Sequence, residues 1–110
     1  MQVSATEIDP QIMARRLEWA DASALAGEAI EFFPGEGEPV TLRVVSAEQR
    51  PSTPAMVQFS IFLRGPADPV FPQRTYRFRH ARLGDYAFLM TAVGRVEGGV
   101  DYEACFSHAP

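Results

Sequence analysis

The residues with the widest scope for chemistry in this chain are two histidines and a single cysteine. His80 ends an alternating segment in which Tyr76 and Phe78 share its face, and this places the imidazole toward a core. A partly buried histidine can titrate near neutrality and serve as a general base or a proton switch. The spacing of residues around His80 indicates no nucleophile and no polarising partner for a catalytic role. The pattern therefore favours a structural role for His80, as a neutral imidazole that is hydrogen-bonded at a strand end. An enzyme that uses His80 stays an alternative.

A metal site is the next possibility, because Cys105 and His108 lie three residues apart. A zinc ion needs three or four protein ligands, and only a coincidence of folding would bring His80 to this pair. Nothing near Cys105 resembles the surroundings that activate a cysteine nucleophile. The glycines lack the form of a phosphate-binding loop, and the carboxylates fall mostly in turns or on polar faces. We therefore expect no catalytic residues, no metal and no cofactor, and a protein that is not an enzyme.

A cluster of arginines is the strongest surface signal in a chain that contains no lysine. They are densest at Arg74, Arg77, Arg79 and Arg82. Strand alternation directs Arg77 and Arg79 to the face opposite Tyr76. Two interpretations stay open: a solvated face with carboxylate partners across the strands, or a contact surface for an anionic partner. The carboxylates available for such pairing are Asp85, Asp101 and Glu103.

The partner of such a surface is expected to be another protein or a second copy of this chain. A net charge of −4 and the absence of lysine argue against nucleic acid. A second hypothesis is a small-ligand-binding barrel, whose mouth includes the polar-tipped side chains of Tyr76, His80 and Tyr102. No apolar run approaches the ~18 residues of a membrane helix, and the first residues lack the pattern of a secretory signal. These features predict a soluble cytoplasmic protein.

A length of 110 residues predicts one domain, with residues 1–8 as a flexible terminus and 9–110 as the folded unit. Asp9-Pro10 is a favourable helix start, and Gly27 is a favourable stop. Apolar residues at helical spacing predict one amphipathic helix over roughly residues 10–25, with a break near residues 21–23 as an option. This helix is expected to cover an open end of a sheet, and docking on a partner is the alternative.

From residue 28 onward the apolar side chains alternate with polar ones, which predicts strands. Glycines and prolines mark the turns, and short connections favour antiparallel pairing. We expect strands over residues 29–33, 40–44, 57–64, 75–80, 86–93 and 100–107, and a loop over 46–55. The predicted fold class is mainly β: a small antiparallel barrel or two-layer sandwich of about six strands with one N-terminal α-helix.

A series of short motifs also runs through the chain: Leu25-Ala-Gly27, Phe59-Ser-Ile-Phe-Leu-Arg-Gly-Pro66, Pro72-Gln73, Thr75-Tyr76, His80, Leu83-Gly84, Phe88-Leu89 and Tyr102-Glu-Ala-Cys-Phe106. In this order the motifs resemble a family of small bacterial proteins with a domain of unknown function, from about residue 17 to residue 107. The resemblance implies no known activity, and it carries an association with phage-tail-like collar and fibre proteins. Ala22 departs from the pattern, in which a phenylalanine often follows the aspartate, and Trp19 is a candidate to replace the lost bulk.

Together these observations predict a non-enzymatic interaction or structural module. It is expected to act through the arginine-bearing face and an exposed strand edge. The resemblance links it to a phage-tail-like or fibre assembly.

Overall fold

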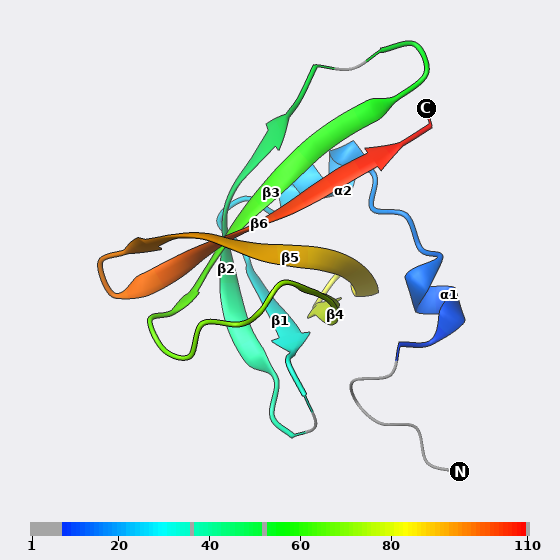
Figure 1. Cartoon of the computed structure of the whole chain (residues 1–110). Coiled ribbons are helices and arrows are strands. Elements are labelled where there is room, and N and C mark those ends of the chain that lie inside the picture. The colour runs from blue at the N-terminus through cyan, green and yellow to red at the C-terminus, as the bar shows by residue number, and fades with distance from the viewer. Residues whose placement is uncertain (1–7, 36, 52, 110) are drawn as a thin grey trace.

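The computed structural model describes residues 8–35, 37–51 and 53–109, and these form a closed antiparallel barrel (Figure 1). The strands are β1 (Ala29–Phe33), β2 (Val40–Gln49), β3 (Val57–Pro66), β4 (Arg74–His80), β5 (Gly84–Val96) and β6 (Gly99–His108). The flexible terminus predicted over residues 1–8 lies outside the described residues, apart from Ile8.

Two three-stranded units build the barrel. β1, β2 and β3 are consecutive antiparallel neighbours, and so are β4, β5 and β6. The units join where β1 pairs with β4 and β3 pairs with β6, which closes the order β1-β2-β3-β6-β5-β4. The mainly β prediction is confirmed, and of its two alternatives the closed barrel forms.

Two strands are much longer than predicted: β5, which covers Gly84–Val96 instead of residues 86–93, and β2. β2 continues to Gln49, although the sequence predicts a loop from residue 46. Its second half pairs with β3, from Ser46 opposite Phe62 to Gln49 opposite Phe59, after a β-bulge that follows Val44. A bulge inserts an extra residue and interrupts the alternation of side chains. The apolar pattern therefore becomes irregular at the point where the strand continues, which is why the loop prediction is wrong there.

The helix predicted over residues 10–25 is wrong as a single element. The structure has two short helices, α1 (Pro10–Met13) and α2 (Trp19–Ala24). The predicted start is correct, because the Asp9 carboxylate accepts a hydrogen bond from the backbone N–H of Gln11 at 2.7 Å. Gly27 follows α2 with a φ of 86°, the left-handed conformation expected at a helix stop.

The break between the helices falls over residues 14–18, and not near residues 21–23. Leu17, in this link, is buried in the core with only 3% of its surface exposed. Arg15 and Arg16 hydrogen-bond to β5 and to the end of the chain. These long-range contacts replace the helical hydrogen bonds that local propensity favours.

The two ends of the barrel are closed by different elements. At one end the connection between β3 and β4 inserts Phe71 between two rings, with centroids 4.8 Å from Phe32 and 6.3 Å from Tyr102. At the other end α2 buries Ala22, and Leu25 follows it into the core. Of the predicted helix, only the α2 part contributes to this cover, because α1 packs against β5 instead.

The interior of the barrel is packed with side chains from every strand. Fully buried examples are Phe32, Leu42, Val44, Ile61, Leu63, Phe78, Met90, Tyr102 and Ala104. Near the α2 end, Trp19 adds its ring to the core at 5.4 Å from Phe59. Across the described ranges, the structure contains no helix of sufficient length and apolar character to span a membrane.

Candidate functional site

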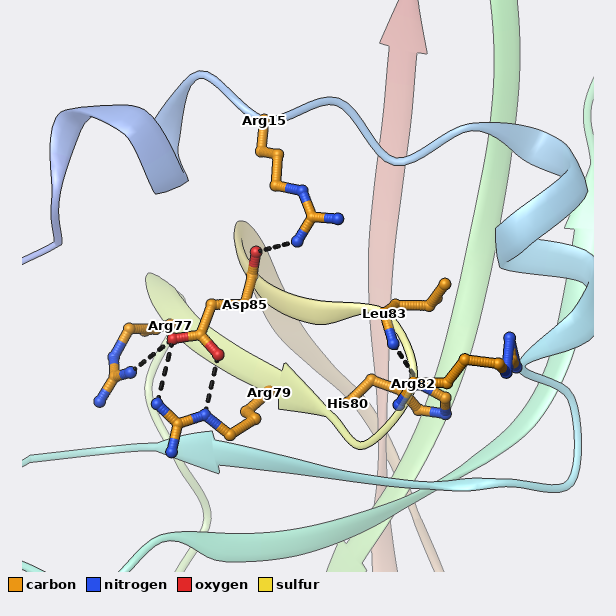
Figure 2. Close-up of polar contacts among 7 residues, drawn as sticks. All are labelled: Arg15, Arg77, Arg79, His80, Arg82, Leu83 and Asp85. Carbon is orange, nitrogen blue, oxygen red and sulfur yellow. Dashed lines mark hydrogen bonds and ion pairs between the residues drawn. The ribbon is translucent and has the colours of Figure 1, made fainter.

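The arginine face consists of Arg74, Arg77, Arg79 and Arg82, on β4 and in the turn after it. Figure 2 shows Arg77 and Arg79 binding the same carboxylate, that of Asp85 on β5. Arg77 Nη1 lies 2.8 Å from Asp85 Oδ2, and Arg79 Nε lies 2.8 Å from Asp85 Oδ1. The β4–β5 ladder sets Asp85 opposite Arg79, so antiparallel pairing creates this cluster. The hydrogen bond from Arg79, followed by that from Arg77, lowers the pKa of Asp85.

The other two arginines of this face differ from each other. Arg82 Nη2 lies 3.2 Å from Glu28 Oε1, whereas the guanidinium of exposed Arg74 lies 5.3 Å from the centroid of the Tyr76 ring. Among the described residues, three of the four arginines therefore have a carboxylate partner. The remaining carboxylates considered as partners bind other arginines: Asp101 binds Arg64 and Glu103 binds Arg50.

His80 is buried, and both of its ring nitrogens are engaged. Nδ1 accepts hydrogen bonds from the backbone N–H groups of Arg82 and Leu83, each at 3.2 Å (Figure 2). Because Nδ1 accepts, the proton is on Nε2, which donates to Glu28 Oε1 at 2.7 Å. This bond is the largest of the influences that lower the pKa of Glu28. The imidazole therefore connects the turn after β4 to the residue that leads into β1.

The three side chains predicted to line a ligand-binding mouth do not converge. Tyr76 and Tyr102 are buried together, and their hydroxyls bind the connection between β3 and β4. Tyr76 Oη donates to the carbonyl of Pro72 at 2.6 Å, and Tyr102 Oη accepts from the N–H of Phe71 at 3.0 Å. His80 lies at the opposite end of β4, roughly 13 Å along the strand from Tyr76. The tyrosines thus hold the segment that closes the barrel.

The structure shows a different opening, a pocket of about 280 Å³ at the side of the barrel. It lies between residues 86–89 of β5 and 105–108 of β6, and residues 15–17 of the helix link form its third wall. In Figure 1 the β5 and β6 ribbons separate in this region, and the chain between α1 and α2 passes across the opening. We call this the seam pocket.

Among the described residues, the lining of the seam pocket combines two arginines with mostly apolar side chains, and it contains no carboxylate side chain. Arg15 lies 4.0 Å from the centroid of the Tyr86 ring and donates to the carbonyl of Asp85 at 2.8 Å (Figure 2). Arg16 donates to the carbonyl of Ala109 at 2.6 Å and to Nδ1 of His108 at 3.2 Å. This arrangement can hold an anionic group beside an apolar one.

Sequence reasoning missed the seam pocket. Residues 15–17 were predicted to be helical, and on a helix Arg15 and Arg16 would occupy its polar face. Nothing in the local pattern indicates that these arginines contact β5 and the C-terminal strand. Leu89 and Val93 are both apolar and exposed on the outer face of β5, and such side chains at outward positions are a signal that the alternation pattern could have provided.

Cys105 and His108 both line the seam pocket but have separate hydrogen-bond partners. Cys105 Sγ donates to Glu103 Oε2 at 3.3 Å, and it accepts from Ser60 Oγ at 3.5 Å. Within residues 8–35, 37–51 and 53–109, no three histidine, cysteine or acidic side chains gather closely enough to hold a metal ion.

The protein is a small closed barrel with an opening at its side. A comparison with protein families shows which family it belongs to. A family model described as a domain of unknown function, DUF6916, matches residues 17–106. The chain therefore belongs to the DUF6916 family, which confirms the resemblance to a domain of unknown function. No curated protein and no solved structure matches the chain.

The Asp85 cluster provides a test of the arginine face. We expect Asp85→Asn to lower the free energy of unfolding at neutral pH by about 1–2 kcal/mol, because two guanidinium groups lose their charged acceptor while partial exposure weakens each pair. Urea denaturation of both proteins measures the difference. Asp101→Asn is the matched control and should cost less, because Asp101 binds one arginine only.

The same pair of proteins has a defined pH dependence. The pKa of Asp85 is lower in the folded chain, so its stabilisation is complete above the unfolded pKa, about 4. It is lost as the pH falls through the lower folded pKa. The difference between wild type and Asp85→Asn should therefore be largest near neutrality and shrink in acid. An equal difference at neutral and strongly acidic pH would contradict this assignment.

Proposed function

We propose that this chain is a non-enzymatic module that binds a protein partner at the seam pocket. The observation that carries the proposal is the composition of that pocket, in which arginines flank an apolar floor. Arginine and aromatic residues are enriched at the centres of protein interfaces, where they supply most of the binding energy. Leu89, at the edge of the pocket, exposes 45% of its surface and adds apolar area for a partner to cover.

The arginine face is a weaker candidate for this contact. The guanidinium groups of Arg77, Arg79 and Arg82 already bind carboxylates of the same chain. An anionic partner would have to compete with Asp85 and Glu28 for them. Arg74, which is exposed, can still contribute to a partner's contact at the edge of this face.

The other functions considered from the sequence have less structural support. A general base needs a ring nitrogen free to accept a proton, whereas His80 Nδ1 binds two backbone amides and Nε2 donates to Glu28. This supports a non-enzymatic role. A small-ligand barrel would need space near Tyr76 and Tyr102, and both side chains are packed in the core. The seam pocket is also slightly smaller than the ~300–1,000 Å³ typical of small-molecule sites.

The biological setting that we propose is a phage-tail-like or fibre assembly. Its support is the resemblance of the motifs in this chain to a family associated with collar and fibre proteins. Purification of tail-like particles from the native host, followed by detection of this chain, tests the setting. A chain that never co-purifies with such particles would contradict it without affecting the binding role.

Site-specific photo-crosslinking tests the binding role. A benzophenone amino acid at Leu89 should capture a discrete protein in the native host, because this side chain lies at the proposed contact. Thr41, exposed on β2 across the barrel, is the control position and should capture none. No cross-link at Leu89, or the same products from both positions, would refute the proposed contact.

A further inference from the structure

We infer that the seam pocket takes a short acidic segment of a partner protein in extended conformation, as an added strand beside β5. This inference rests on the proposed function and specifies its partner. Its starting point is an interruption in the hydrogen-bonding of the barrel wall.

The ladder between β5 and β6 ends before the strands do. It runs from Val96 opposite Gly99 to Thr91 opposite Glu103. β5 nevertheless continues to Gly84, paired with β4, and β6 continues to His108, paired with β3. Each of these continuing stretches therefore has one paired edge and one edge that faces the seam pocket. An unpaired strand edge is a template for another strand.

The direction of the β5 backbone can be deduced from one contact. The carbonyl of Asp85 accepts a hydrogen bond from Arg15, so it points away from β4. Hydrogen-bonding directions alternate along a strand, so the N–H and C=O groups of Ala87 and Leu89 point the same way. Ala87 and Leu89 lie between Asp85, which binds Arg15, and Thr91, where the β5–β6 ladder ends. Their backbone N–H and C=O groups are therefore positioned to pair with an incoming segment.

The charge of the pocket selects the kind of segment. Arg15 and Arg16 are in its lining, and none of the described lining residues is an aspartate or a glutamate, although the chain as a whole has a net charge of −4. Glu18 Oε1 lies 3.7 Å from Arg16 Nε. Both side chains are exposed to solvent, which screens the ion pair, so Glu18 neutralises the charge of Arg16 only in part. A segment carrying carboxylates complements this local positive charge.

The pocket walls complete the match to an extended peptide. Alternate side chains of a strand point to opposite sides, so a peptide can direct one set to the apolar floor and the other to the arginines. The floor includes Leu17 and the rings of Phe88 and Phe106, whose centroids are 5.2 Å apart. His108 also lines the pocket, and its buried Nε2 has no hydrogen-bond partner among the described residues. Nδ1 of the same ring lies 3.2 Å from Arg16 Nη1 and 3.1 Å from the carbonyl oxygen of Ala109.

Selection from a yeast-displayed library of random peptides tests the inference. The folded chain should enrich peptides in which aspartate or glutamate alternates with apolar residues. Ala87→Pro should weaken their binding at least about tenfold, because proline removes the N–H that faces the pocket. Proline is tolerated at such a free edge, and a thermal melt checks that the variant folds. Ala87→Val keeps the N–H and should bind normally.

Charge variants and modified peptides separate strand addition from simple attraction. Arg15→Glu should weaken binding about tenfold, whereas Arg43→Glu, on β2 across the barrel, should leave it unchanged. Two N-methylated versions of an enriched peptide can be compared, one methylated at the odd-numbered backbone nitrogens and one at the even-numbered ones. Only the version methylated on the nitrogens that face β5 should lose binding. No enrichment, or enriched peptides that bind Ala87→Pro as tightly as wild type, would overturn the inference.

The crosslinking experiment distinguishes failure of this inference from failure of the proposed function. If the Leu89 position captures a protein partner equally well in the Ala87→Pro background, the binding role stands and strand addition is wrong. If Leu89 captures nothing, the binding role itself fails. A cross-link between two copies of this chain would show that the pocket binds a second copy of the chain, and the inference of a foreign acidic segment would then be wrong.

Discussion

Phe32→Ala is expected to lower the free energy of unfolding by about 3–5 kcal/mol, a large share of the total stability of a small domain. Phe32 is completely buried on β1, whose pairing with β4 is one of the two junctions between the halves of the barrel. Its ring lies 5.2 Å from that of Tyr76 and 5.7 Å from that of Phe78. Truncation would leave a cavity that these rings and Phe71 cannot fill without moving.

The neighbouring residue provides the matched control. Phe33 has the same side chain on the other face of β1, where it is half-buried under the guanidinium of Arg77 at 3.9 Å. Phe33→Ala should cost about 1 kcal/mol, the range of a partly exposed cation–π contact. Urea denaturation of both variants at neutral pH measures the contrast. Equal losses would mean that the inner and outer faces of β1 are assigned incorrectly.

Gly99→Ala is the second change with a large expected effect, about 1–3 kcal/mol of lost stability. Gly99 is buried at the start of β6, opposite Pro66 of β3. A Cβ at this position would lie 2.7 Å from the carbonyl oxygen of Gly65 and 3.3 Å from Cγ of Arg64. The closest atom belongs to the backbone, so relief requires the β3–β6 pair to separate locally. Thermal or urea unfolding measures the loss.

Gly94→Ala tests whether this cost comes from crowding. Gly94 lies on β5 beside a register irregularity, and a Cβ there would have no heavy atom within 4 Å. Neither Gly94 nor Gly99 has a positive φ, so the two positions differ in space and not in backbone strain. Gly94→Ala should be neutral or stabilise by up to about 1 kcal/mol, because alanine reduces the entropy of the unfolded chain. A loss as large as that of Gly99→Ala would contradict the steric explanation.

The alternation of side chains was sufficient to predict most of the strands. β1 has its predicted bounds, and β4 differs by one residue. Alternation also placed Tyr76, Phe78 and His80 in the interior, where the structure has them. The reason is local: successive residues of a strand face opposite sides whichever strand pairs with it.

The candidate site could not be predicted in the same way. Arg77 and Arg79 were correctly directed outward, but their pairing with Asp85 depends on the register of β4 and β5. Arg15 and Arg16 fall in the predicted helix, because Leu17 fits the helical spacing of apolar residues. That spacing predicts a buried Leu17 but cannot show that the buried side chain comes from a link between two short helices. Register and long-range packing are properties of residues far apart in the chain, so a local pattern does not contain them.

By itself the sequence determined a mainly β chain with its helical segment at the N-terminal side, because periodicity and turn residues act locally. Tertiary structure alone decided that β1 meets β4 and that β3 meets β6, which closes the barrel. It also decided where the β5–β6 ladder stops, and therefore where the seam pocket opens. That position depends on how Leu17, Phe88 and Phe106 pack between two diverging strands, and such packing is fixed only when the whole core assembles.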